Sequence, residues 1–451
     1  MQHTICALAT GPGAGAVALV RLSGPESLRI LSQLTRSGKP FEPRKQVFCS
    51  LYDGQDVLDR ALVTYFKAPH SFTGEDVAEF SLHGSSYVKG RLLELLCQSG
   101  AVPAKRGEFS YRAFLNGKMD LLEAQGLCDL IASGNKAAHQ LAMNSLDGKL
   151  SARLETIKKN LSETLAQIEV RLDDVDEEMS PLDETKTVAS LQRVLFEISK
   201  LADTFSVGKF IKEGLKVAIV GAPNAGKSSL LNALVGFDRA IVSRQSGTTR
   251  DTIEETLDLQ GQKIILTDTA GIRDHALDPA EQEGMKRSVK AMEKADVILF
   301  VLDQTRPLSE EEKKLWADVQ SQNKKTILIL NKLDASQTPD LPEDAARYAQ
   351  VCVSCKTGRG LDDLKTALTA DLNRRAESED GIMISNLRQY EALINAQTEL
   401  ETAVIRLTHR AGGEIYAEHL RAALNYLKDL IGEVTPDDVL GIIFSKFCMG
   451  K

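Results

Sequence analysis

The sequence predicts a multidomain protein made of an α+β domain, an all-α domain in two segments and an inserted α/β domain. Three patterns lead to this fold class. Short strand-like runs separated by Gly and Pro fill residues 1–117, apolar residues recur at helical spacing over 118–212 and 377–451, and continuous apolar runs alternate with helical stretches over 213–376. Since helical segments flank the α/β region on both sides, the simplest arrangement inserts that region into one discontinuous helical domain.

The composition is that of an ordinary globular protein. Of the 451 residues 43% are hydrophobic and 26% are charged, and the formal net charge is −8. This charge argues against a protein that coats nucleic acid through a general basic surface. The 7 cysteines are odd in number and scattered, no apolar run approaches the length of a membrane span, and the first residues lack the pattern of a signal peptide. We therefore expect a cytoplasmic protein that does not act on a membrane.

The first segment predicts a small α+β domain with a slight positive charge. Strand-like runs lie at 16–22, 61–66 and 76–84, and residues 1–117 hold 13 basic and 10 acidic side chains. The rest of the chain therefore carries all of the net negative charge. An anionic ligand would suit this first segment better than the remainder.

The next segment predicts long helices. Apolar residues recur three or four positions apart over 120–146 and 150–172, and again over 392–410 and 415–432. The acidic stretch 173–184 lies between two of these helices. It could hold a metal ion, but it has no glycine pattern of an EF-hand, which favours a solvated loop.

The region from 213 to 376 predicts a largely parallel sheet covered by helices on both faces. Its apolar runs are uninterrupted, as expected for strands that are buried on both sides. These runs lie at 216–221, 263–268, 297–303, 326–332 and 349–355.

A phosphate-binding loop follows the first of these runs. Residues 221–228 read GAPNAGKS and fit the pattern G-x-x-x-x-G-K-[ST] between a strand and a helix. The glycines let backbone N–H groups surround the phosphates, Lys227 supplies a positive charge, and the Ser228 hydroxyl suits Mg²⁺. This context predicts a nucleotide site.

Two further motifs complete the phosphate side of the site. Residues 268–271, Asp-Thr-Ala-Gly, end a strand, which places a carboxylate near the metal and a glycine amide near the γ-phosphate. Between this motif and the phosphate-binding loop lies Gly-Thr-Thr-Arg-Asp at 247–251, where the Thr249 hydroxyl would complete the Mg²⁺ shell.

Two motifs indicate that the base is guanine. Asn331-Lys332-Leu333-Asp334 ends a strand, and the Asp334 carboxylate can accept hydrogen bonds from both N1–H and the exocyclic amine of guanine, a donor pair that adenine lacks. Ser354-Cys355-Lys356 follows the last strand and would offer a backbone N–H to the guanine O6. The C-x-x-C pair that ends at Cys355 can also mean a redox or zinc site, but no second pair accompanies it.

The residue that orients the attacking water is not the usual one. In Ras-type GTPases a Gln follows D-x-x-G, whereas this chain has Ile272 there. Candidates in the next segment are Glu281 and Glu283, with three weaker alternatives. The Asn224 amide oxygen could also hold a monovalent cation beside the phosphates. The weaker alternatives are Asp274, His275 and Asp278.

Taken together, these motifs resemble the MnmE (TrmE) family of tRNA modification GTPases over essentially the whole chain. The stretches FTGEDVAE at 72–79, GEFSYRAFLNGKMDL at 107–121 and the terminal FCMGK add to the resemblance. It implies an N-terminal tetrahydrofolate-binding domain that forms a homodimer and a G domain that dimerises with GTP and K⁺. It also implies a flavin-dependent partner, MnmG (GidA), which carries FAD. With that partner the family adds an aminomethyl or carboxymethylaminomethyl group to C5 of the wobble uridine of certain tRNAs.

The resemblance also assigns roles to residues. It implies that Glu281 is catalytic, with Glu283 competing for this role, and that Cys448 lies near the modification site as a nucleophile, a ligand or a structural residue. Lys227 of the phosphate-binding loop is the further catalytic candidate. The implied ligands are Ser228 and Thr249 for Mg²⁺; Asn224, Ser243, Gln245 and Thr248 for K⁺; and Arg21, Glu79, Lys118 and Lys451 for a 5-formyl or 5,10-methylene tetrahydrofolate. The predicted nucleotide-binding residues are Asn224, Ala225, Gly226, Lys227, Ser228, Ser229, Ser243, Arg244, Gln245, Ser246, Gly247, Thr248, Thr249, Asp268, Thr269, Ala270, Gly271, Asn331, Lys332, Asp334, Ser354, Cys355 and Lys356.

One alternative is a regulatory or ribosome-assembly GTPase without modification chemistry. Such proteins often carry a KH domain, whose G-x-x-G loop clamps the RNA backbone. None of the 32 glycines is followed by another glycine three positions later, which counts against this alternative. A dynamin-like membrane GTPase is disfavoured because the chain has neither a lipid-insertion helix nor a polybasic patch.

Overall fold

The computed structural model describes most of the chain and divides it into two compact units. The first unit comprises residues 1–131, 145–198 and 392–451, and the second comprises 132–144 and 199–391. The described residues are 3–11, 13–172, 182–237, 254–268, 289–335, 340–376, 381–409, 412–447 and 450, without the side chains of 237, 254, 268, 371–376 and 437.

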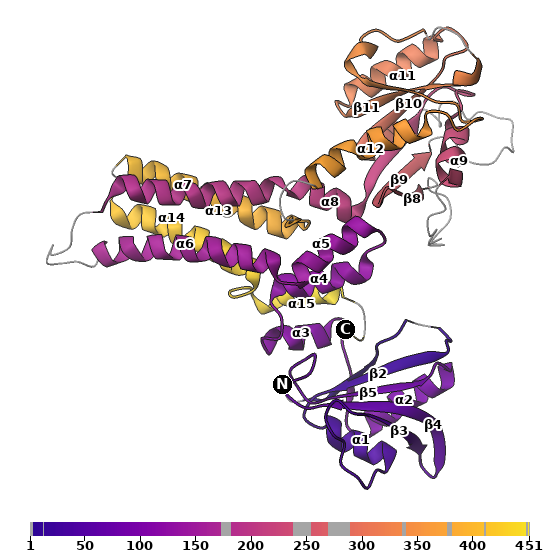
Figure 1. Ribbon diagram of the computed structural model, residues 1–451. Coiled ribbons are helices and arrows are strands. Elements are labelled where there is room, and N and C mark those ends of the chain that lie inside the picture. The colour runs from indigo at the N-terminus through magenta and orange to yellow at the C-terminus, as the bar shows by residue number, and fades with distance from the viewer. Residues whose placement is uncertain are drawn as a thin grey trace. The chain divides into compact units, whose positions relative to one another are not determined.

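The first unit begins with a six-stranded sheet (Figure 1). Its order is β3-β4-β5-β2-β1-β6, and every neighbouring pair is antiparallel except β1 with β6. Alternate residues of the strands point to one face, where they form a core with the helices α1 and α2. The elements are β1 (Ile5–Leu8), β2 (Val17–Ser23), α1 (Ser27–Thr35), β3 (Gln46–Asp53), β4 (Asp56–Phe66), β5 (Val77–His83), α2 (Ser86–Gln98) and β6 (Val102–Pro103).

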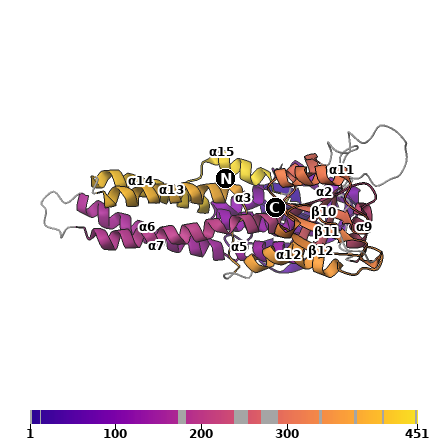
Figure 2. The ribbon, with the colours of Figure 1, turned by 90° about the horizontal axis from the view of Figure 1, so that it is seen from above.

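Long helices make up the rest of the first unit. Figures 1 and 2 show α6, α7, α13 and α14 side by side. Ion pairs cross between them, from Arg153 to Glu197 at 3.0 Å and from Arg421 to Glu169 at 2.7 Å. The helices are α3 (Glu108–Leu115), α4 (Leu121–Ala132), α6 (Lys149–Leu172), α7 (Glu184–Asp203), α13 (Leu387–Thr408), α14 (Gly413–Ile431) and α15 (Asp437–Ser445), of which α4, α7 and α13 extend into the ranges of the second unit.

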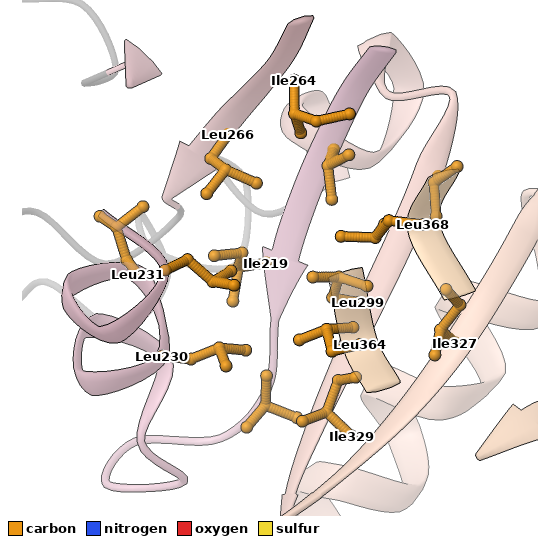
Figure 3. Packing of buried hydrophobic residues seen from close by; sticks show 14 of the residues in the cluster. Ile219, Leu230, Leu231, Ile264, Leu266, Leu299, Ile327, Ile329, Leu364 and Leu368 are labelled. Carbon is orange, nitrogen blue, oxygen red and sulfur yellow. The ribbon is translucent and has the colours of Figure 1, made fainter. Parts of the chain in front are cut away.

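The second unit is built on another six-stranded sheet, with the order β12-β11-β10-β7-β9-β8. All neighbouring pairs are parallel except β8 with β9. Successive residues of one strand enter different cores: Ile219 packs with Leu230 and Leu364 on one face, as Figure 3 shows, while Ala218 and Phe300 pack on the other. The strands are β7 (Leu215–Val220), β8 (Glu254–Leu259), β9 (Gln262–Asp268), β10 (Val297–Asp303), β11 (Lys325–Asn331) and β12 (Ala349–Cys352).

Helices and short 3₁₀ turns cover this sheet. The helix α8 precedes the sheet in the chain, and α12 follows it and contacts α8. A hydrophobic cluster of α5, α8 and Met383 completes the unit. The elements are α5 (Lys136–Leu146), α8 (Phe205–Glu213), α9 (Lys227–Phe237), α11 (Glu310–Ser321), η1 (Leu333–Ala335), η2 (Ala345–Arg347) and α12 (Leu361–Ala376).

The predicted sheet of the α/β region is confirmed, and two details differ from the sequence patterns. The pattern over 120–146 is two helices, α4 and α5, separated by a short break at 133–135. The polar edge strand β8 was not predicted and pairs antiparallel with β9. No described helix is long and apolar enough to cross a membrane.

Candidate functional site

The phosphate-binding loop joins β7 to α9 and requires glycine at both ends. A Cβ on Gly221 would lie 2.4 Å from the backbone oxygen of Val301, and one on Gly226, whose φ is +99°, would lie 2.1 Å from Nδ2 of Asn331. Asn224 also adopts a positive φ of 63°. The loop is therefore folded tightly against the ends of the neighbouring strands β10 and β11.

Lys227 is held over this loop. Its Nζ donates to the backbone oxygens of Gly221 and Ala222, each at 2.8 Å. Ser228 and Ser229 follow it in the first turn of α9, and Ala225 before it is buried. The amides at this helix start and the lysine bring together N–H donors and a positive charge, which are the groups that bind phosphate oxygens.

Asn331 joins the phosphate-binding loop to the loop after β12. Its side chain is buried; Nδ2 donates to the backbone oxygen of Ala225 at 2.9 Å, and Oδ1 accepts a hydrogen bond from Cys355 Sγ at 3.3 Å. Burial raises the pKa of Cys355 to about 11, so the thiol keeps the proton that it donates. The structure thus brings together three of the sequence motifs through one amide side chain.

Asp334 and Ser354 form the second contact between these loops. Ser354, which is buried, donates its hydroxyl to Asp334 Oδ1 at 2.7 Å. This hydrogen bond, helped by a backbone hydrogen bond and by the charges of Lys356 and Lys332, holds the pKa of Asp334 below its usual range. The carboxylate is exposed and ionised at neutral pH, and it is therefore purely an acceptor.

Several predicted residues of the phosphate side lie outside the described residues. Asp268 ends β9 opposite Ile219 of β7, as the motif predicted, and only its backbone is described. Among the described residues no group of three or more His, Cys, Asp and Glu could hold a metal ion. The residues outside the description are Ser243, Arg244, Gln245, Ser246, Gly247, Thr248, Thr249, Thr269, Ala270, Gly271, Glu281 and Glu283.

The predicted folate residues of the first unit include one close pair. Arg21 of β2 lies opposite Glu79 of β5, and its Nε donates to the carboxylate at 2.9 Å. The Arg21 guanidinium also lies 5.2 Å from the ring centroid of Phe72 and 5.7 Å from that of Phe109. The two phenylalanines lie in the FTGED and GEFSYR stretches. The sequence motifs therefore included both rings but did not indicate that they contact Arg21.

The other predicted folate residues are less informative. Lys118 is exposed, and its Nζ donates to the backbone oxygen of Pro69 at 3.0 Å. Cys448 and Lys451 lie outside the described residues. The structure therefore brings Arg21 and Glu79 together, whereas the described hydrogen bond of Lys118 goes to Pro69.

Two glycines connect the C-terminal segment to the N-terminal part of the same unit. A Cβ on Gly107 would lie 2.2 Å from the backbone oxygen of Phe444, and one on Gly450, whose φ is +84°, would lie 2.2 Å from that of Leu8. In the β1–β2 register Leu8 lies opposite Val20, next to the pair of Ala7 and Arg21. Gly450 of the tail is therefore packed against the end of β1, beside the pair of residues that follows Ala7–Arg21 in the register of β1 and β2.

We expect Gly450→Ala to release this tail, because the added Cβ overlaps the backbone of β1 and the positive φ disfavours alanine. Carboxypeptidase digestion followed by mass spectrometry should then show faster removal of the terminal residues. Gly441→Ala in α15 is the matched control, since nothing lies within 4 Å of a Cβ at that position. Equal digestion rates for the two variants would contradict a tight seat for Gly450.

Comparison with known protein families shows to which family the chain belongs, and the matches cover nearly all of its length. Residues 4–118 match the family described as GTP-binding protein TrmE N-terminus, and residues 121–448 match the MnmE helical domain. The chain belongs to the MnmE family. Curated relatives, each called tRNA modification GTPase MnmE, agree over their full lengths. The one from Parabacteroides distasonis is 38% identical over 463 residues, with 100% of both chains covered.

Two further MnmE relatives support this membership. The protein from Akkermansia muciniphila is 40% identical over 455 residues, which cover 100% of this chain and 99% of the relative, and that from Aquifex aeolicus is 38% identical over 453 residues, with 100% of both covered. The predicted family and fold class are thus confirmed, and the chain is a GTP-hydrolysing enzyme of the MnmE family. The exact domain boundaries and the roles of the site residues stay predictions.

Proposed function

We propose that the chain binds GTP at the loops around Asn331 and uses its hydrolysis to drive tRNA modification. The product is a wobble uridine that carries an aminomethyl-type group at C5, and the one-carbon unit comes from a tetrahydrofolate. The observation that carries the proposal is the hydrogen-bonded joint at Asn331, since one side chain links the phosphate-binding loop to the predicted guanine loop. The full-length relatives, named tRNA modification GTPases, supply the substrate class.

The nucleotide site offers suitable groups for its ions. Ser228 lies in the first turn of α9 beside the glycine-lined loop, where a hydroxyl suits Mg²⁺, and Thr249 would complete the shell. Asn224, at a positive φ at the tip of the loop, would hold K⁺ together with Ser243, Gln245 and Thr248. When bound, the cations neutralise charge that develops on the phosphate oxygens. Glu281 would orient the water.

The N-terminal sheet offers suitable groups for an anionic, aromatic ligand. The Arg21 guanidinium has a carboxylate partner and two phenyl rings around it, and a pterin with a glutamate tail would find stacking surface and positive charge there. Glu79, Lys118 and Lys451 would complete the site. A bound tetrahydrofolate would supply the one-carbon unit, and Cys448 would act near it.

The proposal includes three further properties that come with the family. The chain forms a homodimer through its N-terminal domain, works with the flavin-dependent MnmG (GidA) in a heterotetramer or larger complex, and acts in the cytoplasm on tRNA.

The test is nucleoside analysis of tRNA from a strain that lacks the gene. The wobble modification should be absent and should return with the wild-type gene. It should not return with Lys227→Ala, because this substitution removes the ammonium group that lies over the phosphate-binding loop. Unchanged wobble uridines in the deletion strain would favour a ribosome-assembly GTPase instead.

Purified protein should hydrolyse GTP faster in K⁺ than in Na⁺. Loss of turnover in Glu281→Ala but not in Glu283→Ala would identify the catalytic glutamate.

A further inference from the structure

Asp303 ends β10 next to the strand that carries the predicted guanine motif. It pairs with Asn331 in the parallel register of β10 and β11. Its side chain is only 6% exposed. Oδ1 accepts hydrogen bonds from the Thr305 backbone N–H at 3.0 Å and from the Thr305 hydroxyl at 2.6 Å. The carboxylate is therefore fixed in orientation by a local turn, and its other oxygen is presented in a defined direction.

That other oxygen contacts the lysine of the guanine motif. Oδ2 of Asp303 lies 2.5 Å from Nζ of Lys332. Lys332 has a φ of 68°, a backbone conformation that is uncommon for a residue with a side chain, and its side chain is 40% exposed. Lys332, on a strained backbone, is thus held by a carboxylate that is buried and fixed in orientation.

A second cation, Arg306, lies farther from Asp303 and pairs mainly with another carboxylate. Arg306 Nε lies 3.9 Å from Oδ2 of Asp303, but the two terminal nitrogens of Arg306 donate to the two carboxylate oxygens of Glu312, each at 2.9 Å. Burial by itself would raise the pKa of Asp303, yet the hydrogen bonds from Lys332 and Thr305 outweigh it and lower that pKa. Asp303 is thus ionised at neutral pH, and Lys332 is its nearest cation among the described residues.

We propose that Asp303 is a positioning residue that holds the Lys332 ammonium in place for the guanine nucleotide. The inference rests on the proposed function, in which the Asn331-Lys332-Leu333-Asp334 loop receives the base. A lysine side chain loses considerable rotamer freedom when it becomes ordered, and a pre-formed ion pair removes that cost from the binding step. Asp303 thus contributes to affinity alone, whereas Asp334 contributes to affinity and also selects the base.

The first test compares Asp303→Asn with Asp258→Asn by titration with a fluorescent GDP analogue. The Asp303 variant keeps the Oδ1 acceptor for Thr305 and loses the charge that holds Lys332, so we expect its Kd to rise by about tenfold. Asp258 accepts a hydrogen bond from Gly261 N–H in the β8–β9 hairpin of the same unit, and the same substitution there should leave Kd within about twofold. A preference for guanine over xanthine nucleotides should survive in both variants.

A double-mutant cycle separates positioning from a general structural effect. In a Lys332→Ala background, Asp303→Asn should change Kd no further. An equal loss in both backgrounds would overturn the proposal, because the effect would then not pass through Lys332. If Asp303→Asn does not fold, Asp303→Glu, which keeps the charge on a longer arm, is put through the same cycle. A Lys332→Ala variant with unchanged guanine-nucleotide affinity would refute the nucleotide loop itself, which is a failure of the proposed function.

Discussion

Asp334→Asn is expected to lower the affinity for GTP by about 10²–10³-fold and to raise that for xanthosine triphosphate. Asp334 is exposed and ionised, with Oδ1 bonded to the Ser354 hydroxyl. A carboxylate accepts from both N1–H and the exocyclic amine of guanine, and two charge-assisted hydrogen bonds are together worth about 3–4 kcal/mol. An amide at that position offers a donor in place of one acceptor, which suits the second carbonyl of xanthine.

Hydrolysis rates at a series of GTP and XTP concentrations would measure this exchange of preference. The control is Asp344→Asn, an exposed aspartate of the same unit whose Oδ1 lies 3.4 Å from Arg347. Its surface pair should contribute little, so both rates should match those of the wild type. A variant at 334 that still prefers GTP would show that this carboxylate does not read the base.

Arg112→Met is expected to destabilise the N-terminal sheet by about 3–5 kcal/mol. The Arg112 side chain is 3% exposed and is an ion-pair partner of Glu75 at 3.1 Å and Glu108 at 2.9 Å. Its Nη1 also donates to the backbone oxygen of His3 at 2.9 Å. Methionine would fill much of the volume but leave two poorly solvated carboxylates without their cation.

Hydrogen exchange with mass spectrometry is the suitable measurement, because the single tryptophan, Trp316, lies in the other unit and would not report on this sheet. Peptides from β2 and β5 should lose protection in Arg112→Met. Arg91→Met is the control: Arg91 pairs with Asp53 at 2.6 Å, but its side chain is 28% exposed, so the same peptides should lose much less protection. Equal losses in the two variants would contradict the importance of burial.

The sequence patterns predicted elements well where burial is complete and poorly where it is partial. All residues of β10 are buried, and its continuous apolar run was recognised with the correct bounds, 297–303. The edge strand β8 has the sequence EETLDL, which has few apolar residues and depends on its pairing with β9. Similarly, the sequence patterns did not predict the ranges of α1 and α2. Both helices are short, and their apolar residues form a recognisable face only against the sheet that they cover.

For the site, motifs identified the residues but not the contacts between them. The guanine motif named Lys332, yet nothing in its spacing indicated Asp303, which is 29 positions away and meets it only because β10 and β11 are in register. Arg21 was predicted through the family resemblance, whereas its contacts with Phe72 and Phe109 depend on how a loop and a helix pack beside β2. Long-range neighbours of this kind require the three-dimensional structure.

The contact between α8 and α12 bears on the ancestry of the chain. One helix leads into the α/β sheet and the other leads out of it, so the two ends of the segment that carries this sheet are neighbours. A module with adjacent ends can be spliced into a host at a single peptide bond without stretching either partner. A single insertion of a gene segment that encodes the α/β module is thus sufficient to explain why the helical domain consists of two separate segments of the chain.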